Sequence, residues 1–199
     1  MAIYLNTDTA LRNFNELANS KYFIDKSNIL RKLNTFISTP NKYICITKPR
    51  RFGKSSIINM LGAYYTKGYN SKDIFDKLNI SKENSYLENL NKYNVINISF
   101  SDIPSDGLTY SNYISNIEKQ IKKDILETYK DKKIEQNQEL YKIFLETKEE
   151  FVFIIDEWDY IFSHDLFKEN QKDFLEFLRN LLKDKPYVAL CYMTEIGRA

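Results

Sequence analysis

The sequence predicts an α/β fold in which helices cover both faces of a mainly parallel sheet. Four short apolar runs, at 43–47, 93–100, 151–155 and 187–194, are rich in β-branched and aromatic residues. Near-continuous apolar runs of this length are typical of strands buried on both faces. Segments with apolar residues at helical spacing lie between them, and this alternation requires parallel strands joined by right-handed crossovers.

The most informative stretch is 44–56, where an apolar strand leads into a polar loop that ends in Gly53-Lys54-Ser55 and then into a helical pattern. This order is typical of a phosphate-binding P-loop, whose backbone N–H groups and helix N-terminus attract a polyphosphate. We expect Lys54 to contact the terminal phosphates and the Ser55 hydroxyl to bind Mg²⁺. Gly53 leaves room for the backbone to approach the phosphate.

Lys48 stands where the common pattern G-x-x-x-x-G-K-[ST] has its first glycine. The alternative interpretation is therefore a basic turn that caps a helix. Guanidinium groups can bind phosphate with two hydrogen bonds, so we expect at least one of Arg50 and Arg51 to contact the nucleotide. The predicted nucleotide-binding set is Pro49, Arg50, Arg51, Phe52, Gly53, Lys54, Ser55 and Ser56.

A second stretch, 151–157, is an uninterrupted apolar run that ends in Asp156-Glu157. In an open α/β sheet, ligands bind outside the carboxyl ends of the strands, where the Gly-Lys-Ser loop also begins. We expect Asp156 to meet Mg²⁺ opposite Ser55 and to hold it through water, and Glu157 to polarise an attacking water as general base. The alternative is a solvated turn in which Glu157 caps the next helix.

The remaining elements follow from capping residues and apolar spacing. Ser27 caps a helix that Pro40 ends, and Thr109 begins a long amphipathic helix. Residues 1–40 are expected to form an arm and a helix packed on the core, and residues 41–199 to form the core itself. Further helices are expected at 57–64, 74–75, 86–90, 109–129, 140–145 and 166–182, with a short extended piece at 21–26.

Composition excludes several classes of protein. The chain has 199 residues, a net charge of +2 and 43% hydrophobic residues, which is ordinary for a globular fold and gives no sign of a nucleic-acid-coating protein. It has no apolar run long enough to span a bilayer and no signal-peptide pattern, so we expect a cytoplasmic protein without a membrane partner. Cys45 and Cys191 lie in apolar runs and are expected to be buried, reduced and structural.

Four segments together resemble the bacterial AAA-ATPase-like family of P-loop ATPases, whose longer members often carry a C-terminal nuclease-like domain of the PD-(D/E)XK type. The segments are Y-F-I-D-K-S (Tyr22 to Ser27), T-K-P-R-R-F-G-K-S (Thr47 to Ser55), F-I-I-D-E-W-D (Phe153 to Asp159) and Y-M-T (Tyr192 to Thr194). The family tolerates a basic residue in place of the first glycine. The resemblance implies ATP and Mg²⁺ as ligands, with Lys54 and Ser55 on phosphate and metal and with Asp156 and Glu157 as the metal and catalytic acids.

The resemblance also implies a three-layer P-loop NTPase of the additional-strand, AAA type. In that class the strand after the Asp-Glu strand ends in a polar sensor, so Thr194 is expected to contact the γ-phosphate or the attacking water; the alternative is an ordinary turn residue. Family members usually continue through another strand, so we expect a core truncated after the sensor strand. An exposed last strand would favour a protein partner or self-association along that edge of the sheet.

The leading functional hypothesis is a Mg²⁺-dependent ATPase module that hydrolyses the β–γ bond, with Lys54, Glu157 and Thr194 in catalysis. The alternative is a nucleotide-dependent switch that binds ATP without turnover and signals to a partner or a nuclease-like domain. A small-molecule kinase is a third interpretation, but the Asp-Glu pair suits water activation better. Nucleic acid could be the effector, given the nuclease-like domain of longer family members, but no aromatic and basic stacking pattern requires it.

Overall fold

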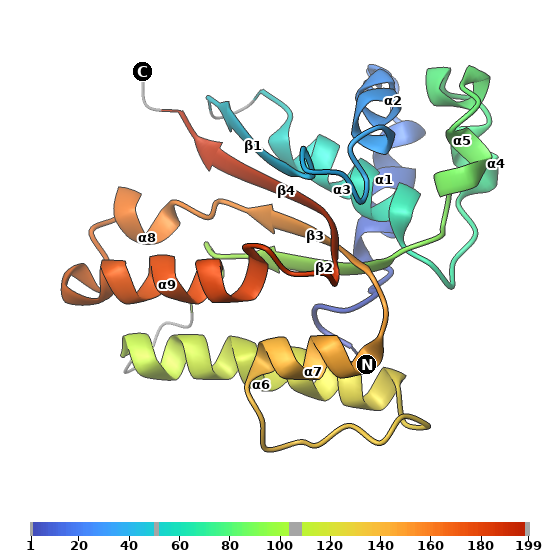
Figure 1. Ribbon diagram of the computed structural model, residues 1–199. Helices are drawn as coiled ribbons and strands as arrows, with labels where there is room; N and C mark the ends of the chain where they lie inside the picture. The colour runs from blue at the N-terminus through green and yellow to red at the C-terminus, as the bar shows by residue number, and fades with distance from the viewer. Residues whose placement is uncertain (1, 50–51, 104–108, 198–199) are drawn as a thin grey trace.

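The computed structural model, which describes residues 2–49, 52–103 and 109–197, confirms the α/β class (Figure 1). Four strands form a sheet in the order β1-β4-β3-β2, and every neighbouring pair is parallel. The strands are β1 (Tyr43–Lys48), β2 (Asn94–Ser99), β3 (Phe151–Asp156) and β4 (Val188–Ile196). All four carboxyl ends therefore meet at one edge of the sheet.

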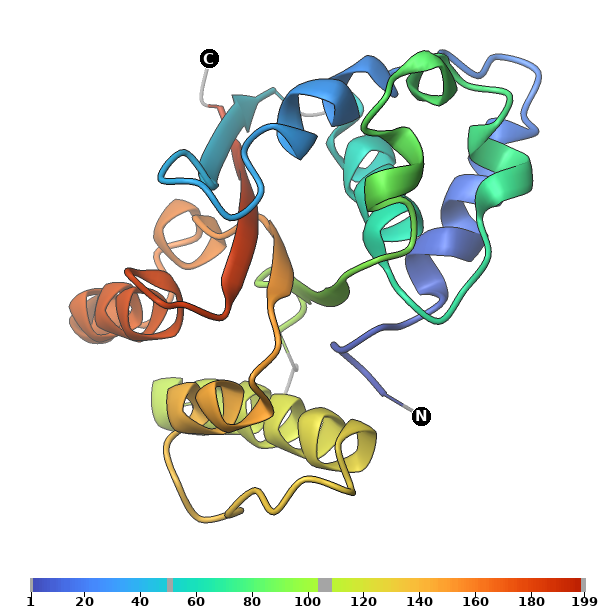
Figure 2. The same ribbon diagram turned by 45° about the vertical axis from the view of Figure 1, so that its right-hand side comes forward.

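Helices cover both faces of this sheet, so the described residues form three layers (Figures 1 and 2). On one side of the sheet, α3 (Lys54–Tyr65) packs on the strands, and α1 (Thr9–Ala18), α2 (Asn28–Asn34), α4 (Lys72–Phe75), the 3₁₀ helix η1 (Asn79–Lys82) and α5 (Tyr86–Asn89) share the same apolar core. The other side packs against α6 (Tyr110–Thr128), α7 (Leu140–Thr147), α8 (Tyr160–Ser163), η2 (Lys168–Asn170) and α9 (Gln171–Leu182).

Strand β3 shows how the sheet separates two apolar cores. Its residues alternate between the faces: Phe153 and Ile155 pack on the α6 side, whereas Val152 and Ile154 pack on the α3 side. All four side chains are completely buried. The near-continuous apolar run in the sequence follows directly from this two-sided burial.

Helices α1 and α3 approach closely on the α3 face. A Cβ atom at Gly62 would lie 2.4 Å from the Cβ of Ala10, which is far inside van der Waals contact. Gly62 is thus the residue that lets the N-terminal helix pack directly on the helix that follows the phosphate loop. Where the boundary between the expected arm and the core lies stays a prediction.

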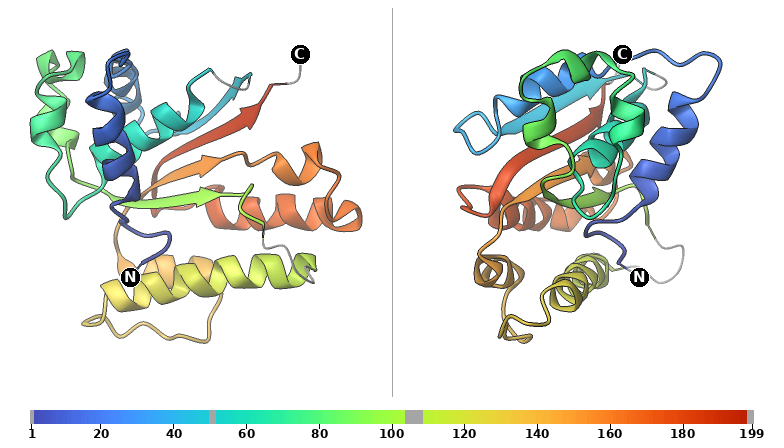
Figure 3. Two further views of the ribbon diagram at one scale, coloured as in Figure 1. Left: turned by 180° about the vertical axis from the view of Figure 1, so that it is seen from behind. Right: turned by 90° about the vertical axis from the view of Figure 1, so that its right-hand side faces the viewer.

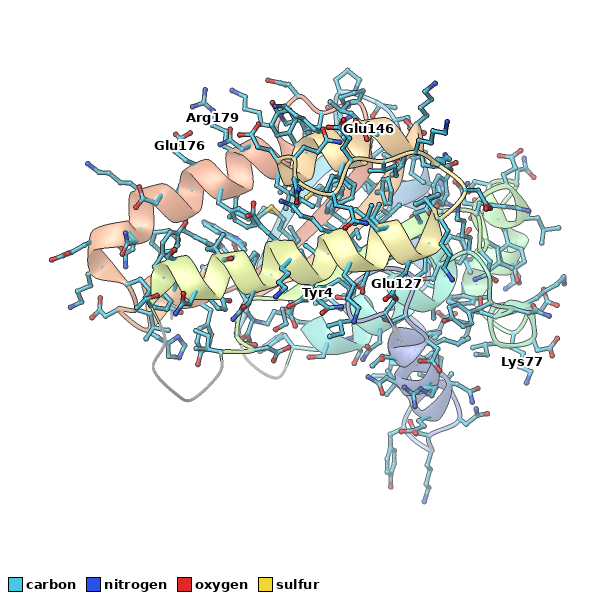
Figure 4. The ribbon with its side chains drawn as sticks, turned by 90° about the horizontal axis from the view of Figure 1, so that it is seen from below. Tyr4, Lys77, Glu127, Glu146, Glu176 and Arg179 are labelled. Carbon is cyan, nitrogen blue, oxygen red and sulfur yellow. The ribbon has the colours of Figure 1, made fainter. Side chains whose placement is uncertain are left out.

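The outer edge of β2 is partly covered by the N-terminal residues, a contact that the sequence did not predict (Figure 3). Leu5 forms an antiparallel bridge with Ile96. The carboxylate of Asp124, on α6, accepts hydrogen bonds from the backbone N–H groups of Ile3, Tyr4 and Leu5 at 2.9, 2.7 and 3.2 Å. Figure 4 shows Tyr4 lying beside α6.

Three sequence-based expectations were wrong. The last strand is not an exposed edge, because β4 lies between β1 and β3; among the described residues the open edge belongs to β1. Cys45 is exposed, on the edge strand β1. The helix expected from residue 166 begins at Gln171, because Phe167 adopts a left-handed φ of 48° that interrupts it.

No helix in the described part of the chain is long and apolar enough to cross a membrane.

Candidate functional site

The loop after β1 leads into α3 through a glycine with a special backbone conformation. Gly53 is the N-cap of α3 and has a φ of 76°, a left-handed value that favours glycine. Lys54, Ser55 and Ser56 form the first turn, where backbone N–H groups have no helical partner. Of the other predicted loop residues, Pro49 and Phe52 are exposed, and Arg50 and Arg51 lie outside the described residues.

Lys54 is the one lysine of this loop whose side chain is buried. The side chain is 9% exposed, and its Nζ makes no hydrogen bond within the described part of the chain. The closest carboxylate oxygen recorded is Glu157 Oε1, at 3.7 Å. An ammonium group that is buried beyond hydrogen-bonding distance of an acceptor is costly, so this geometry is suited to an anion that completes the contacts of Lys54.

Thr194 joins the tips of β3 and β4. Its hydroxyl donates a hydrogen bond to Asp156 Oδ1 and accepts one from the backbone N–H of Glu157, at 3.3 Å. Its carbonyl accepts a further bond from the N–H of Trp158, at 3.1 Å. The Thr194 side chain is 1% exposed, and Glu157 adopts a positive φ of 49° directly after the strand. Thr194 therefore holds both acids in place from the neighbouring strand.

The two stretches singled out in the sequence come together at the carboxyl edge of the sheet. Strand β4 lies between the strands that carry them, with Ile46 opposite Thr194 on one side and Ile155 opposite Met193 on the other. The ion pair between Lys54 and Glu157 spans the gap between the loop and the acid strand. Lys54, Asp156, Glu157 and Thr194 thus form one cluster.

Ser55 and Asp156 carry the oxygen donors expected of the magnesium ligands. No group of three or more His, Cys, Asp and Glu side chains gathers among the described residues in a way that could hold a metal alone. A P-loop does not need such a group, because Mg²⁺ there takes one hydroxyl, a carboxylate, water and the phosphates themselves. Ser55 is exposed on the first turn of α3, and Asp156 is half-buried at the end of β3.

One residue near the loop was missed by the motif analysis. A Cβ atom at Gly53 would lie 2.5 Å from the Nζ of Lys26, so this second lysine sits against the loop. Its signal in the sequence was the segment from Tyr22 to Ser27, which the family resemblance marked without giving it a role. Two cavities, of about 740 and 1160 Å³, lie along α6, and no predicted site residue lines either of them.

Comparison with known proteins gives a family and no individual relative. Residues 9–195 match the AAA-ATPase-like family, whose description is predicted AAA-ATPase. No curated protein and no solved structure matches the chain. The match runs from the first helix through the acid strand to β4, and at a coarse level it implies nucleotide binding and ATP hydrolysis. The chain belongs to the AAA-ATPase-like family.

Proposed function

We propose that this chain is a Mg²⁺-dependent ATPase module that binds ATP at the loop 49–56 and hydrolyses its β–γ bond. The observation that carries the proposal is the buried Nζ of Lys54, which has no hydrogen bond in the described part of the chain and lies 3.7 Å from Glu157. A lysine held this way beside a helix N-terminus is suited to the phosphates of a nucleotide, and the family match supports the same chemistry at a coarse level.

In this proposal each residue has one task. Glu157 accepts a proton from water as the water oxygen bonds to the γ-phosphorus and the bond to the β–γ bridging oxygen breaks, which yields ADP and phosphate. Lys54 neutralises charge that develops on the phosphate oxygens. Thr194 positions Asp156 and Glu157. Mg²⁺, held by Ser55 and Asp156, would supply further charge neutralisation when it is bound.

The alternative, a switch that binds ATP without turnover, differs in one measurable step. Single-turnover hydrolysis with enzyme in excess of ATP and Mg²⁺ present reports chemistry directly, and calorimetry reports binding. We expect wild type to bind and hydrolyse ATP. Glu157→Gln should bind ATP within a few-fold of wild type and hydrolyse it about 10²- to 10⁴-fold more slowly, the usual effect of losing a general base.

Two further variants make the result specific. Lys54→Ala should lose nucleotide binding while its circular dichroism spectrum is unchanged. Glu176→Gln, the same chemical change at an exposed position on the outside of α9, should behave as wild type (Figure 4). Wild-type binding without turnover would favour the switch, and equal affinity of Lys54→Ala and wild type for Mg-ATP would refute the site itself.

A further inference from the structure

Within the segment Tyr22 to Ser27, the two residues that flank Lys26 are held by hydrogen bonds. Asp25 accepts hydrogen bonds from the backbone N–H groups of Ser27, at 2.8 Å, and of Asn79, at 2.7 Å. The Ser27 hydroxyl, which is completely buried, accepts one from the N–H of Ile80 at 3.1 Å. Both residues that flank Lys26 are thus tied to the 3₁₀ helix η1.

Lys26 itself points the other way, toward the phosphate loop. Its Nζ lies where it would be 2.5 Å from a Cβ atom at Gly53, the N-cap of α3. No hydrogen bond or ion pair joins this ammonium to any described residue. The side chain is exposed, so it is free to move toward a ligand while its backbone stays fixed.

Two lysine ammonium groups lie near the N-terminus of α3, and the recorded ion pair there is the one between Lys54 and Glu157, at 3.7 Å. Lys26 lies against Gly53, the N-cap, and Lys54 is the first residue of this 12-residue helix, whose dipole is positive at that end and favours an anion. The buried Nζ of Lys54, nine-tenths of whose side chain is inaccessible, independently lacks a hydrogen-bond partner within the described chain. Two cations at a positive helix end are stabilised by a ligand that carries several negative charges.

A small, mostly apolar cavity lies beside Lys26. This cavity, of about 140 Å³, is lined by Lys26, by Ser56 and by apolar side chains that include Phe23, Ile24 and Met60. Because Lys26 and Ser56 line it, this cavity adjoins the first turn of α3, where the phosphates would bind.

We propose that Lys26 is a second phosphate-binding lysine of the site, held toward the loop by the hydrogen bonds of Asp25 and Ser27 to η1. This inference rests on the proposed nucleotide site and deepens it: the ligand class is a nucleoside polyphosphate whose phosphates are gripped by lysines from two separate segments. Because the Lys26 Nζ lies against Gly53 at the N-terminus of α3, its contact is with the phosphate chain and not with the nucleoside.

The test compares two ligands, Mg-ATP and Mg-tripolyphosphate, by calorimetry on the full chain. Loss of a charge-assisted hydrogen bond predicts that Lys26→Ala weakens both ligands about tenfold or more, and by the same factor. Lys26→Arg should keep most of the affinity. Lys21→Ala removes the same charge five residues earlier, where the ammonium lies over the Tyr22 ring, and should bind as wild type.

The outcomes are separable. The inference is wrong if Lys26→Ala binds both ligands as tightly as wild type, or if it loses affinity for ATP alone. A phosphate contact must contribute to the affinity for both ligands. An equal loss in Lys21→Ala would also overturn it, by showing that only general charge matters. If wild type binds neither ligand, the proposed nucleotide site itself fails, and Lys26 fails with it. Unchanged melting temperatures of the variants exclude a folding effect.

Discussion

At the scale of single residues, the Thr194 hydroxyl is the part of the site with the least freedom to move. It is buried, donates to Asp156 and accepts from the backbone of Glu157, so both acids depend on it for their positions. Removing the hydroxyl leaves the Glu157 N–H without its recorded acceptor and frees Asp156 to adopt other rotamers. The position of the acids, and not the fold of the sheet, is what this residue controls.

Thr194→Val should therefore lower the free energy of unfolding by about 1–3 kcal/mol, the cost of a buried polar group left unpaired. Its single-turnover rate should fall by more than its affinity for Mg-ATP, because misplaced acids affect the reaction more than phosphate binding. Thr194→Ser keeps the hydroxyl and is the matched control. Equal rates for Thr194→Val and Thr194→Ser would show that the hydroxyl has no part in positioning the acids.

The sequence predicted the site residues that lie in contiguous motifs. It did not predict the residue that reaches the site only in the folded chain. Gly53, Lys54, Asp156 and Glu157 each end or follow an apolar run, so a strand-edge argument was enough to place them together. Lys26 reaches the loop only because its neighbours bind backbone groups at 79–80, more than fifty residues further along the chain. Local patterns carry no information about such a contact.

At the scale of elements, the close contact of α1 and α3 depends on two small residues. Gly62 faces Ala10 at a distance that leaves no room for another carbon atom. Since α3 also presents Lys54 and Ser55, this contact couples the N-terminal helix to the orientation of the phosphate loop. The same approach explains why a glycine stands inside a helix, where it normally costs stability.

Gly62→Ala should accordingly destabilise the protein by about 1–3 kcal/mol in spite of alanine's better helix propensity, because overpacking forces the helices apart. Adding Ala10→Gly should restore part of that loss. A double-mutant cycle in urea measures the coupling, which we expect to be at least about 0.5 kcal/mol in favour of the double variant. Independent, additive effects of the two substitutions would show that the helices do not meet here.

The sequence predicted which strands and helices form where their apolar runs were long. It did not predict the order of the strands in the sheet. The strands and the helix 110–128 were expected nearly where they lie. The position of β4 inside the sheet depends on which crossover passes over which strand, and a run of apolar residues looks the same at the centre and at the edge. The exposure of Cys45 was missed for the same reason, since burial of β1 depends on which elements are its neighbours in space.

At the scale of the whole molecule, the three layers make the two cysteines unequal. Cys191 is completely buried in the interior strand β4, and burial raises the pKa of its thiol to about 12. Cys45 is exposed on the edge strand β1. Because β4 pairs with a strand on each side, Cys191 can react with a thiol reagent only when the sheet opens.

Thiol labelling can therefore test fold and ligand site together, in a Cys45→Ser background that leaves Cys191 as the single cysteine. A ligand that binds only the native state stabilises it by RT ln(1 + [L]/Kd), so Mg-ATP at 100 times its Kd should slow labelling about a hundredfold. Adding Lys54→Ala to this background should remove the protection. Labelling that Mg-ATP does not slow, in protein shown by calorimetry to bind it, would mean that β4 opens without disturbing the site, although Thr194 on that strand holds both acids.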